Sequence, residues 1–168
     1  AGRASPHIQC NPTHSPREKG AEPMSARTFV YGLMTNRPSL TALIGGDEPR
    51  IFAKKTMTSS LEVHPYLVYK LGNETNRNFS EGYDISNQFI QVWVHDYHDG
   101  DSADYMLIDK VLAEVKAALV GQQSGDDLVW NIEWLETSQD LNDDTLNTVF
   151  RYARFQMVKA DDSSGVMP

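Results

Sequence analysis

The stretch Gln88-Phe89-Ile90-Gln91-Val92-Trp93-Val94-His95 decides the fold of this chain. Its side chains alternate between two faces, as they do along a β-strand. The residues of one face are aliphatic and are expected to lie in a core: Ile90, Val92 and Val94. The other face is aromatic but polar enough to meet a partner, with Phe89, Gln91, Trp93 and His95. The stretch therefore predicts a central strand that uses both of its faces.

An acidic turn and an amphipathic helix follow this strand. Either Asp101 or Ser102 is suited to cap the helix, because its side chain can accept hydrogen bonds from the free N–H groups of the first turn. The segment 103–119 places its apolar residues on one side and its charged residues mostly on the other. Gly121 is expected to end the helix.

The composition is that of a soluble globular protein. The chain has 168 residues, of which 40% are hydrophobic and 23% charged, and no apolar run is long enough to cross a bilayer. The formal net charge of −8 argues against a general nucleic-acid binder, because affinity for phosphate comes largely from clustered Lys and Arg. We expect no signal peptide, and the single cysteine, Cys10, suits a reducing compartment.

Composition divides the chain into three parts. Residues 1–23 hold four prolines and almost no large apolar side chains, so they form no core of their own. A floppy tail is the plain interpretation, but we favour an extended N-terminal arm that lies on a neighbouring subunit. Residues 24–160 form a single domain, and residues 161–168 form a polar C-terminal tail.

The first half of the domain is predicted to contain a helix capped by Ser25 and a shorter helix closed by Gly45-Gly46. The segment 50–53 is predicted as a short edge strand, and 65–71 as a strand with proline at its first residue. The polar segment 72–84 is predicted as a long loop.

The second half adds two strands to the central one. In 128–134, alternation of large apolar with other residues predicts a half-buried strand. The segment 139–144 has turn chemistry, and 145–158 is predicted as a long last strand with aromatic residues on both faces. This order predicts an α+β fold, a mostly antiparallel sheet with two main helices packed on it.

The turn at residues 95–101 is the one stretch whose residue types suggest a metal-binding or catalytic site. It holds His95, His98 and three aspartates, which in principle can ligate a transition metal. The spacing fits no metal-binding motif, and acidic residues before a helix are expected from capping and the helix dipole. We therefore predict no metal, no cofactor and no catalytic residue, with a small metal-dependent enzyme as the alternative.

Other functional classes find little support. There is no nucleophile motif of the GxSxG type. Exposed aromatic residues could stack on single-stranded nucleic acid, but that use needs basic neighbours. The span 121–144 instead contains seven acidic residues and no Lys or Arg. Aromatic residues of a core or a protein interface are the better interpretation.

The order of segments resembles the tail terminator, or tail-completion, proteins of long-tailed bacteriophages. The resemblance rests on short stretches: Leu40-Thr41-Ala42-Leu43-Ile44-Gly45-Gly46, Arg50-Ile51-Phe52, His64-Pro65-Tyr66-Leu67-Val68-Tyr69 and Phe89 to Val94. The helix 103–119 and the closing strand pair complete it. It covers roughly Met24 to Val158 and excludes the arm.

The resemblance implies a virion protein that forms a ring, commonly a hexamer, at the head–tail junction after assembly in the host cytoplasm. Such a ring caps the tail tube, ends its polymerisation and joins the tail to a head-completion or connector protein. Genomic DNA passes through its lumen without specific binding. We expect the subunit interface to involve Phe79, Tyr83, Phe89 and Trp93, and the lumen or tube mouth to carry Asp140, Asp143 and Asp144. The alternative is another neck or tube protein, such as a head-completion or tail tube subunit.

Overall fold

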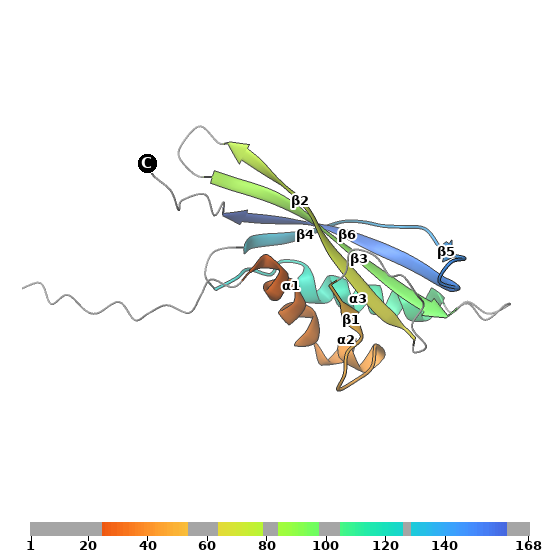
Figure 1. The fold of residues 1–168 in the computed structure, drawn as a ribbon. Helices are drawn as coiled ribbons and strands as arrows, with labels where there is room; N and C mark the ends of the chain where they lie inside the picture. Colours follow the sequence, from red (N-terminus) through yellow and green to blue (C-terminus); the bar gives the residue numbers. More distant parts are fainter. Residues whose placement is uncertain (1–24, 54–63, 79–83, 98–104, 126–128, 161–168) are drawn as a thin grey trace, which may run out of the picture.

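A six-stranded sheet with helices packed against one face makes up the part of the chain that the structure describes (Figure 1). The computed structural model describes residues 25–53, 64–78, 84–97, 105–125 and 129–160. Its helices are α1 (Ala26–Thr35), α2 (Pro38–Leu43) and α3 (Tyr105–Leu119). Its strands are β1 (Ile51–Phe52), β2 (Tyr66–Asn78), β3 (Asp84–Tyr97), β4 (Val129–Thr137), β5 (Leu141–Asp143) and β6 (Thr148–Ala160). The predicted α+β class is confirmed, with α1 and α3 as the two longer helices.

The strands lie in the order β1-β2-β3-β6-β4, and β5 pairs with β6 beside this path. All neighbours are antiparallel except β1, which runs parallel to β2 and pairs with Leu67 and Val68 alone. β3 is paired along its length with β2 and β6, so the stretch predicted as central lies in the middle of the sheet. The predicted edge strand at 50–53 is also confirmed as β1.

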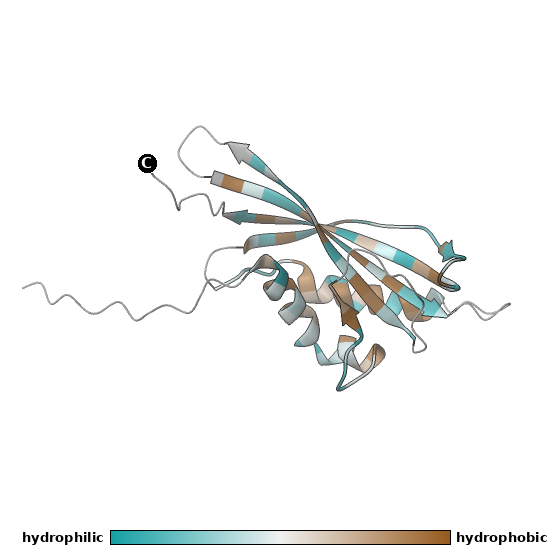
Figure 2. Cartoon of the chain, viewed as in Figure 1, coloured by the Kyte–Doolittle hydropathy of each residue, from teal (hydrophilic) through white to brown (hydrophobic). Residues whose placement is uncertain are grey.

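The core lies between the sheet and the helices. Ile90, Val92 and Val94 of β3 are 0% exposed, as their alternation predicts. The register places Phe155 opposite Ile90 and Ala153 opposite Val92, so β6 contributes to the same face. Colouring by hydropathy shows apolar residues in the strand segments that lie beside the helices (Figure 2). The helices contribute mainly aliphatic side chains to this core: Val30, Met34, Ile108, Val111, Val115 and Leu119.

The helix ends follow local rules that the sequence predicts. The Ser25 Oγ accepts a hydrogen bond from the Thr28 N–H at 3.2 Å and caps α1. Gly46 and Gly121 have φ of 65° and 75°, which favours glycine after α2 and α3. Asp101 and Ser102, the predicted caps of α3, lie outside the described residues. None of the described helices has the length and apolarity that crossing a lipid bilayer requires.

The predicted long loop at residues 72–84 is wrong, because β2 continues to Asn78 and β3 begins at Asp84. The register between them shifts at Leu71 and Glu74, and the Gln88 Nε2 donates to the Gly72 carbonyl at 3.0 Å. This part of the hairpin extends beyond the helices in Figure 1, so its side chains need not be apolar. Because the residues of this segment are mostly polar, they lack the alternation of apolar side chains from which a strand is predicted.

The prediction of simple alternation in 128–134 is also wrong. β4 has two register shifts against β6, and its buried residues are Val129 and Ile132, three positions apart. Trp134, which alternation would place in the core, is 41% exposed. In the segment predicted as a turn, residues 141–143 form β5, and the turn itself follows at 144–147. β6 accordingly begins at Thr148 and not at residue 145.

Candidate interaction surface

The sheet face opposite the helices is the candidate functional surface. We call it the open face, since none of the described helices packs on it. Pairing in register puts the following side chains on it: Tyr66, Val68 and Lys70 of β2; Phe89, Gln91, Trp93 and His95 of β3; Glu133 and Glu136 of β4; and Phe150, Tyr152, Arg154 and Gln156 of β6. The face is thus mixed aromatic, polar and charged, unlike the aliphatic face beneath the helices.

One end of the open face is filled by stacked rings. The His95 ring lies between the rings of Tyr66 and Phe150, with centroids 4.9 and 5.1 Å away. The Tyr66 ring is in turn contacted by those of Phe52 and His64 at 6.3 and 5.2 Å. Tyr66 is 0% exposed and His95 only 6%. This end of the face is therefore packed, so His95 is a buried residue and not one that meets a partner.

His95 is held in its neutral form. Burial lowers the pKa of the His95 imidazole to about 4, and the nearby carboxylate of Asp143 opposes this change only in part. The His95 Nδ1 lies 3.0 Å from the Thr148 Oγ1, so the ring keeps one hydrogen-bond partner while it is buried. At neutral pH the stack therefore carries no charge on this ring.

The middle of the open face is different, because its side chains are only partly buried. Trp93 and Phe89 lie on the same face of β3, two positions on either side of Gln91, and each is partly exposed. The Arg154 guanidinium lies 4.4 Å from the centre of the Phe89 ring and 3.7 Å from the Glu136 carboxylate. The structure thus places two of the predicted interface residues together on one accessible surface. The other two, Phe79 and Tyr83, lie outside the described residues.

The acidic hairpin at the end of β5 and β6 has local partners for its charges. Asp140 is ion-paired with Arg151 at 3.4 Å, and Arg151 also bridges to Asp109 of α3. The Asp143 Oδ1 accepts from the Thr145 and Leu146 N–H groups, both at 3.0 Å. The Asn142 Nδ2 donates to Asp144 at 2.6 Å. Asp143 therefore stabilises the turn itself, a role that the count of acidic residues does not reveal.

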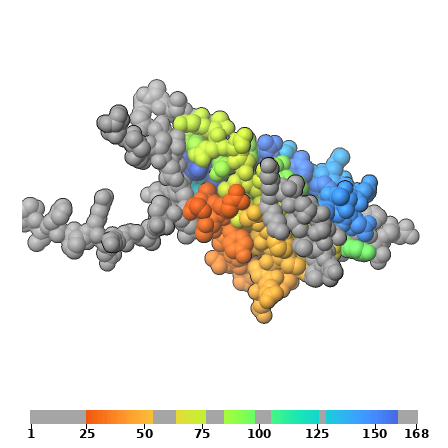
Figure 3. All heavy atoms as spheres, viewed as in Figure 1, coloured from red at the N-terminus to blue at the C-terminus, as the bar shows by residue number. Residues whose placement is uncertain are grey.

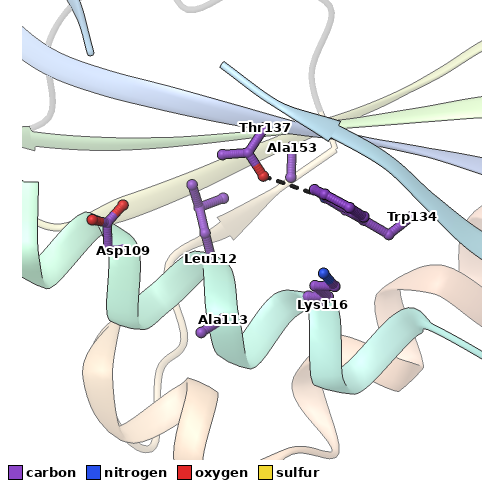
Figure 4. Close-up of a pocket in the computed structure, with 7 residues that line it drawn as sticks. All are labelled: Asp109, Leu112, Ala113, Lys116, Trp134, Thr137 and Ala153. Atoms are coloured by element: carbon purple, nitrogen blue, oxygen red, sulfur yellow. Dashed lines mark hydrogen bonds between the residues drawn. The ribbon is translucent and has the colours of Figure 1, made fainter. Parts of the chain in front are cut away.

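A shallow cavity of about 210 Å³ lies between α3 and the outer part of β4 (Figure 4). Within it the Lys116 Nζ lies 3.6 Å from the centre of the Trp134 ring, and the Trp134 Nε1 donates to the Thr137 Oγ1 at 3.3 Å. The cavity is lined by Asp109, Leu112, Ala113, Lys116, Trp134, Thr137 and Ala153. The indole of Trp134 on β4 therefore lies at the protein surface.

No group of three His, Cys, Asp or Glu side chains that could hold a metal ion occurs among the described residues. Of the turn with candidate ligands, His98 and the two aspartates that follow it lie outside those residues. The described part of the turn, residues 95–97, completes β3, and Tyr97 is 51% exposed at its end.

Comparison with known proteins shows which fold this chain has. No protein-family model and no curated protein matches this chain. Among solved structures, a chain of the structure described as "Virion of native gene transfer agent (GTA) particle" has the same fold, with a TM-score of 0.58 and 17% sequence identity. The match covers 79% of this chain and 92% of that one. It therefore spans nearly the whole of the other subunit and shows that the two chains share one architecture.

Proposed function

We propose that this chain is a structural protein of a phage-like virion, and that it forms a ring at the end of the tail tube. The fold that it shares with a chain of a gene transfer agent particle supports a place in such a particle. Its segment order, which resembles that of tail terminator proteins, supports the finer role. In that role the ring caps the tube, ends its polymerisation and joins the tail to the head.

The open face is the single observation that carries this proposal. Trp93 and Phe89 are partly exposed beside an arginine and glutamines, and protein interfaces are enriched in aromatic residues and arginine. In Figure 3, part of the sheet lies at the surface beside α1 and α2, which are drawn in orange. We propose that a neighbouring copy covers Phe89 and Trp93, together with Phe79 and Tyr83 of the hairpin tip.

The acidic hairpin suits the mouth of such a ring. DNA that passes through must not be held, and carboxylates repel its phosphates. Asp140 and Asp144 remain largely exposed although each has a local partner. In the proposed ring they face the lumen or the tube, with Asp143 holding the turn that presents them.

Replacing Trp93 with Glu tests this proposal. A carboxylate at this position would be buried without a partner in the assembled ring, so we expect a folded, soluble monomer. The matched control is Met106→Glu, because Met106 is 71% exposed on α3, away from the open face. Native mass spectrometry gives the number of copies, and circular dichroism reports whether each variant is folded.

The functional readout is tail length. In cells that produce particles with only the Trp93→Glu protein, we expect heads without tails of defined length, while Met106→Glu behaves as wild type. Normal assembly and normal tails with Trp93→Glu would refute the interface. A wild-type protein that stays monomeric at high concentration and in its particles would refute the ring itself.

A further inference from the structure

The sheet has two long outer edges. On β2, pairing with β1 ends at Val68, and no described strand pairs with the outer side of residues 69–78. On β4, residues 129–137 pair with β6 on one side. On the other side, the Gly121 N–H donates to the Ile132 carbonyl and the Ser124 N–H to the Val129 carbonyl, both at 2.9 Å, and no described segment pairs with the outer side of residues 133–137. Each edge therefore presents backbone N–H and C=O groups that can pair with another strand. Edges of this length usually have a partner or a protective feature.

The two edges run in opposite directions. From β2 to β3, from β3 to β6 and from β6 to β4, every step is antiparallel, so β4 points opposite to β2. Copies related by rotation about a ring axis keep the direction of each strand along that axis. The β4 of one copy would therefore meet the β2 of the next in antiparallel orientation, which continues the alternation of the sheet.

The charges at the two edges are complementary. Lys70 is exposed on the open-face side of β2, opposite Gln91 of β3. Glu133 is exposed on the open-face side of β4, opposite Gln156 of β6. Both charges thus lie on the same face of the sheet, one at each edge. Opposite charges across paired strands favour pairing, and like charges oppose it.

We propose that neighbouring copies join edge to edge, with β4 of one copy paired to β2 of the next, and that this seam repeats around the ring. This inference rests on the proposed ring and specifies how it closes. Adjacent strands are about 4.8 Å apart, and β3 lies one strand from the seam. Phe89 and Trp93 of β3 are then two strand spacings, about 10 Å, from β4 of the neighbouring copy, within reach of its longer side chains.

Exchanging the two charges tests the seam. Lys70→Glu leaves both edges with a negative charge on this face, and Glu133→Lys leaves both with a positive charge, so each single variant should raise the concentration needed for half-assembly about tenfold. The double variant Lys70→Glu/Glu133→Lys should restore assembly. A mixture of the two single variants should also form rings, because alternating copies satisfy every seam. Lys110→Glu on α3, also exposed, is the control for a charge change outside the seam.

Two measurements decide the outcome: native mass spectrometry of each variant and of the mixture, and amide hydrogen exchange of residues 133–137 in ring and monomer. Slower exchange of β4 in the ring, with rescue in the mixture, is the expected result. Wild-type rings together with single variants that assemble normally would overturn the seam and leave the proposed function intact. Equal protection of β4 in a monomeric variant would overturn it as well, since another part of the same chain would then cover that edge. A wild-type protein that never forms rings would refute both proposals.

Discussion

The two faces of the sheet come from the same strands but differ in chemistry and exposure. On β6, Ala153, Phe155 and Met157 lie under the helices and are at most 1% exposed. Tyr152 and Arg154 alternate with them on the open face and are partly exposed. The difference teaches that one strand can serve two functions at once, with every second residue holding the fold and the residues between them available for contact. Substitutions one or a few positions apart should therefore have unlike effects.

The largest expected difference is between Phe155→Ala and Tyr152→Ala. Phe155 is 0% exposed in the core, and its truncation should lower the free energy of unfolding by about 3–5 kcal/mol. Tyr152→Ala, on the open face, should cost about 1 kcal/mol in the monomer. Urea unfolding of both variants, made in the monomeric Trp93→Glu background, checks this. Equal losses would show that the open face is as much a core as the helical face.

The packed end of the open face should make stability depend on pH. The pKa of His95 is about 4 in the fold and 6.5 in a model peptide, so the fold favours the neutral ring. A depressed histidine pKa contributes stability that is complete above pH 6.5 and is lost as the pH falls toward 4. The free energy of unfolding should therefore decrease by about 2 kcal/mol at pH 5, and by about 3 kcal/mol below pH 4.

Urea unfolding at pH 7.5, 6.0 and 5.0 measures this dependence. His95→Gln should flatten the curve, because glutamine has no charge to gain. The His64 ring contacts the ring of Tyr66, which in turn stacks on His95. His64→Gln should therefore leave most of the pH dependence of the free energy of unfolding in place. A slope unchanged in His95→Gln would assign the pH dependence to another group.

The smallest effect concerns the helical layer. Ser25→Ala removes the side chain that caps α1 and should lower the free energy of unfolding by about 1 kcal/mol. Ser25→Asp should restore most of it, because aspartate is as good a cap. Both variants should form rings as wild type does, since α1 covers the face away from the proposed contacts. A ring that fails to form with Ser25→Ala would mean that the helical layer also takes part in assembly.

Much of the fold could be predicted because local patterns were unambiguous. The alternation in residues 88–95 identified the central strand and both of its faces, and Ser25, Gly46 and Gly121 marked helix ends through hydrogen bonding and backbone geometry. The extension of β2 could not be predicted, since polar residues form a strand only when a partner strand is present to pair with them. The exposure of Trp134 depends on register shifts in β4, which leave no signal in local periodicity.

The candidate surface was predictable in part. Phe89 and Trp93 share a face by alternation alone, and the structure brings Arg154 and Tyr152 beside them from a strand some 60 residues away in the chain. His95 was assigned to the same face, but its neighbours Tyr66 and Phe150 come from other strands and bury it. The partners of Asp140 and the turn-stabilising role of Asp143 likewise required the folded hairpin.

By itself the sequence determined which residues alternate, where the helices begin and end, and that the two sides of β3 differ, because these features depend on neighbours within a few positions of the chain. Only the tertiary structure decided which strands lie side by side, which part of the open face is packed, and that β2 and β4 are outer edges with opposite directions. Those features arise from pairing between distant segments, and pairing is selected by the packing of the whole core and not by any single stretch.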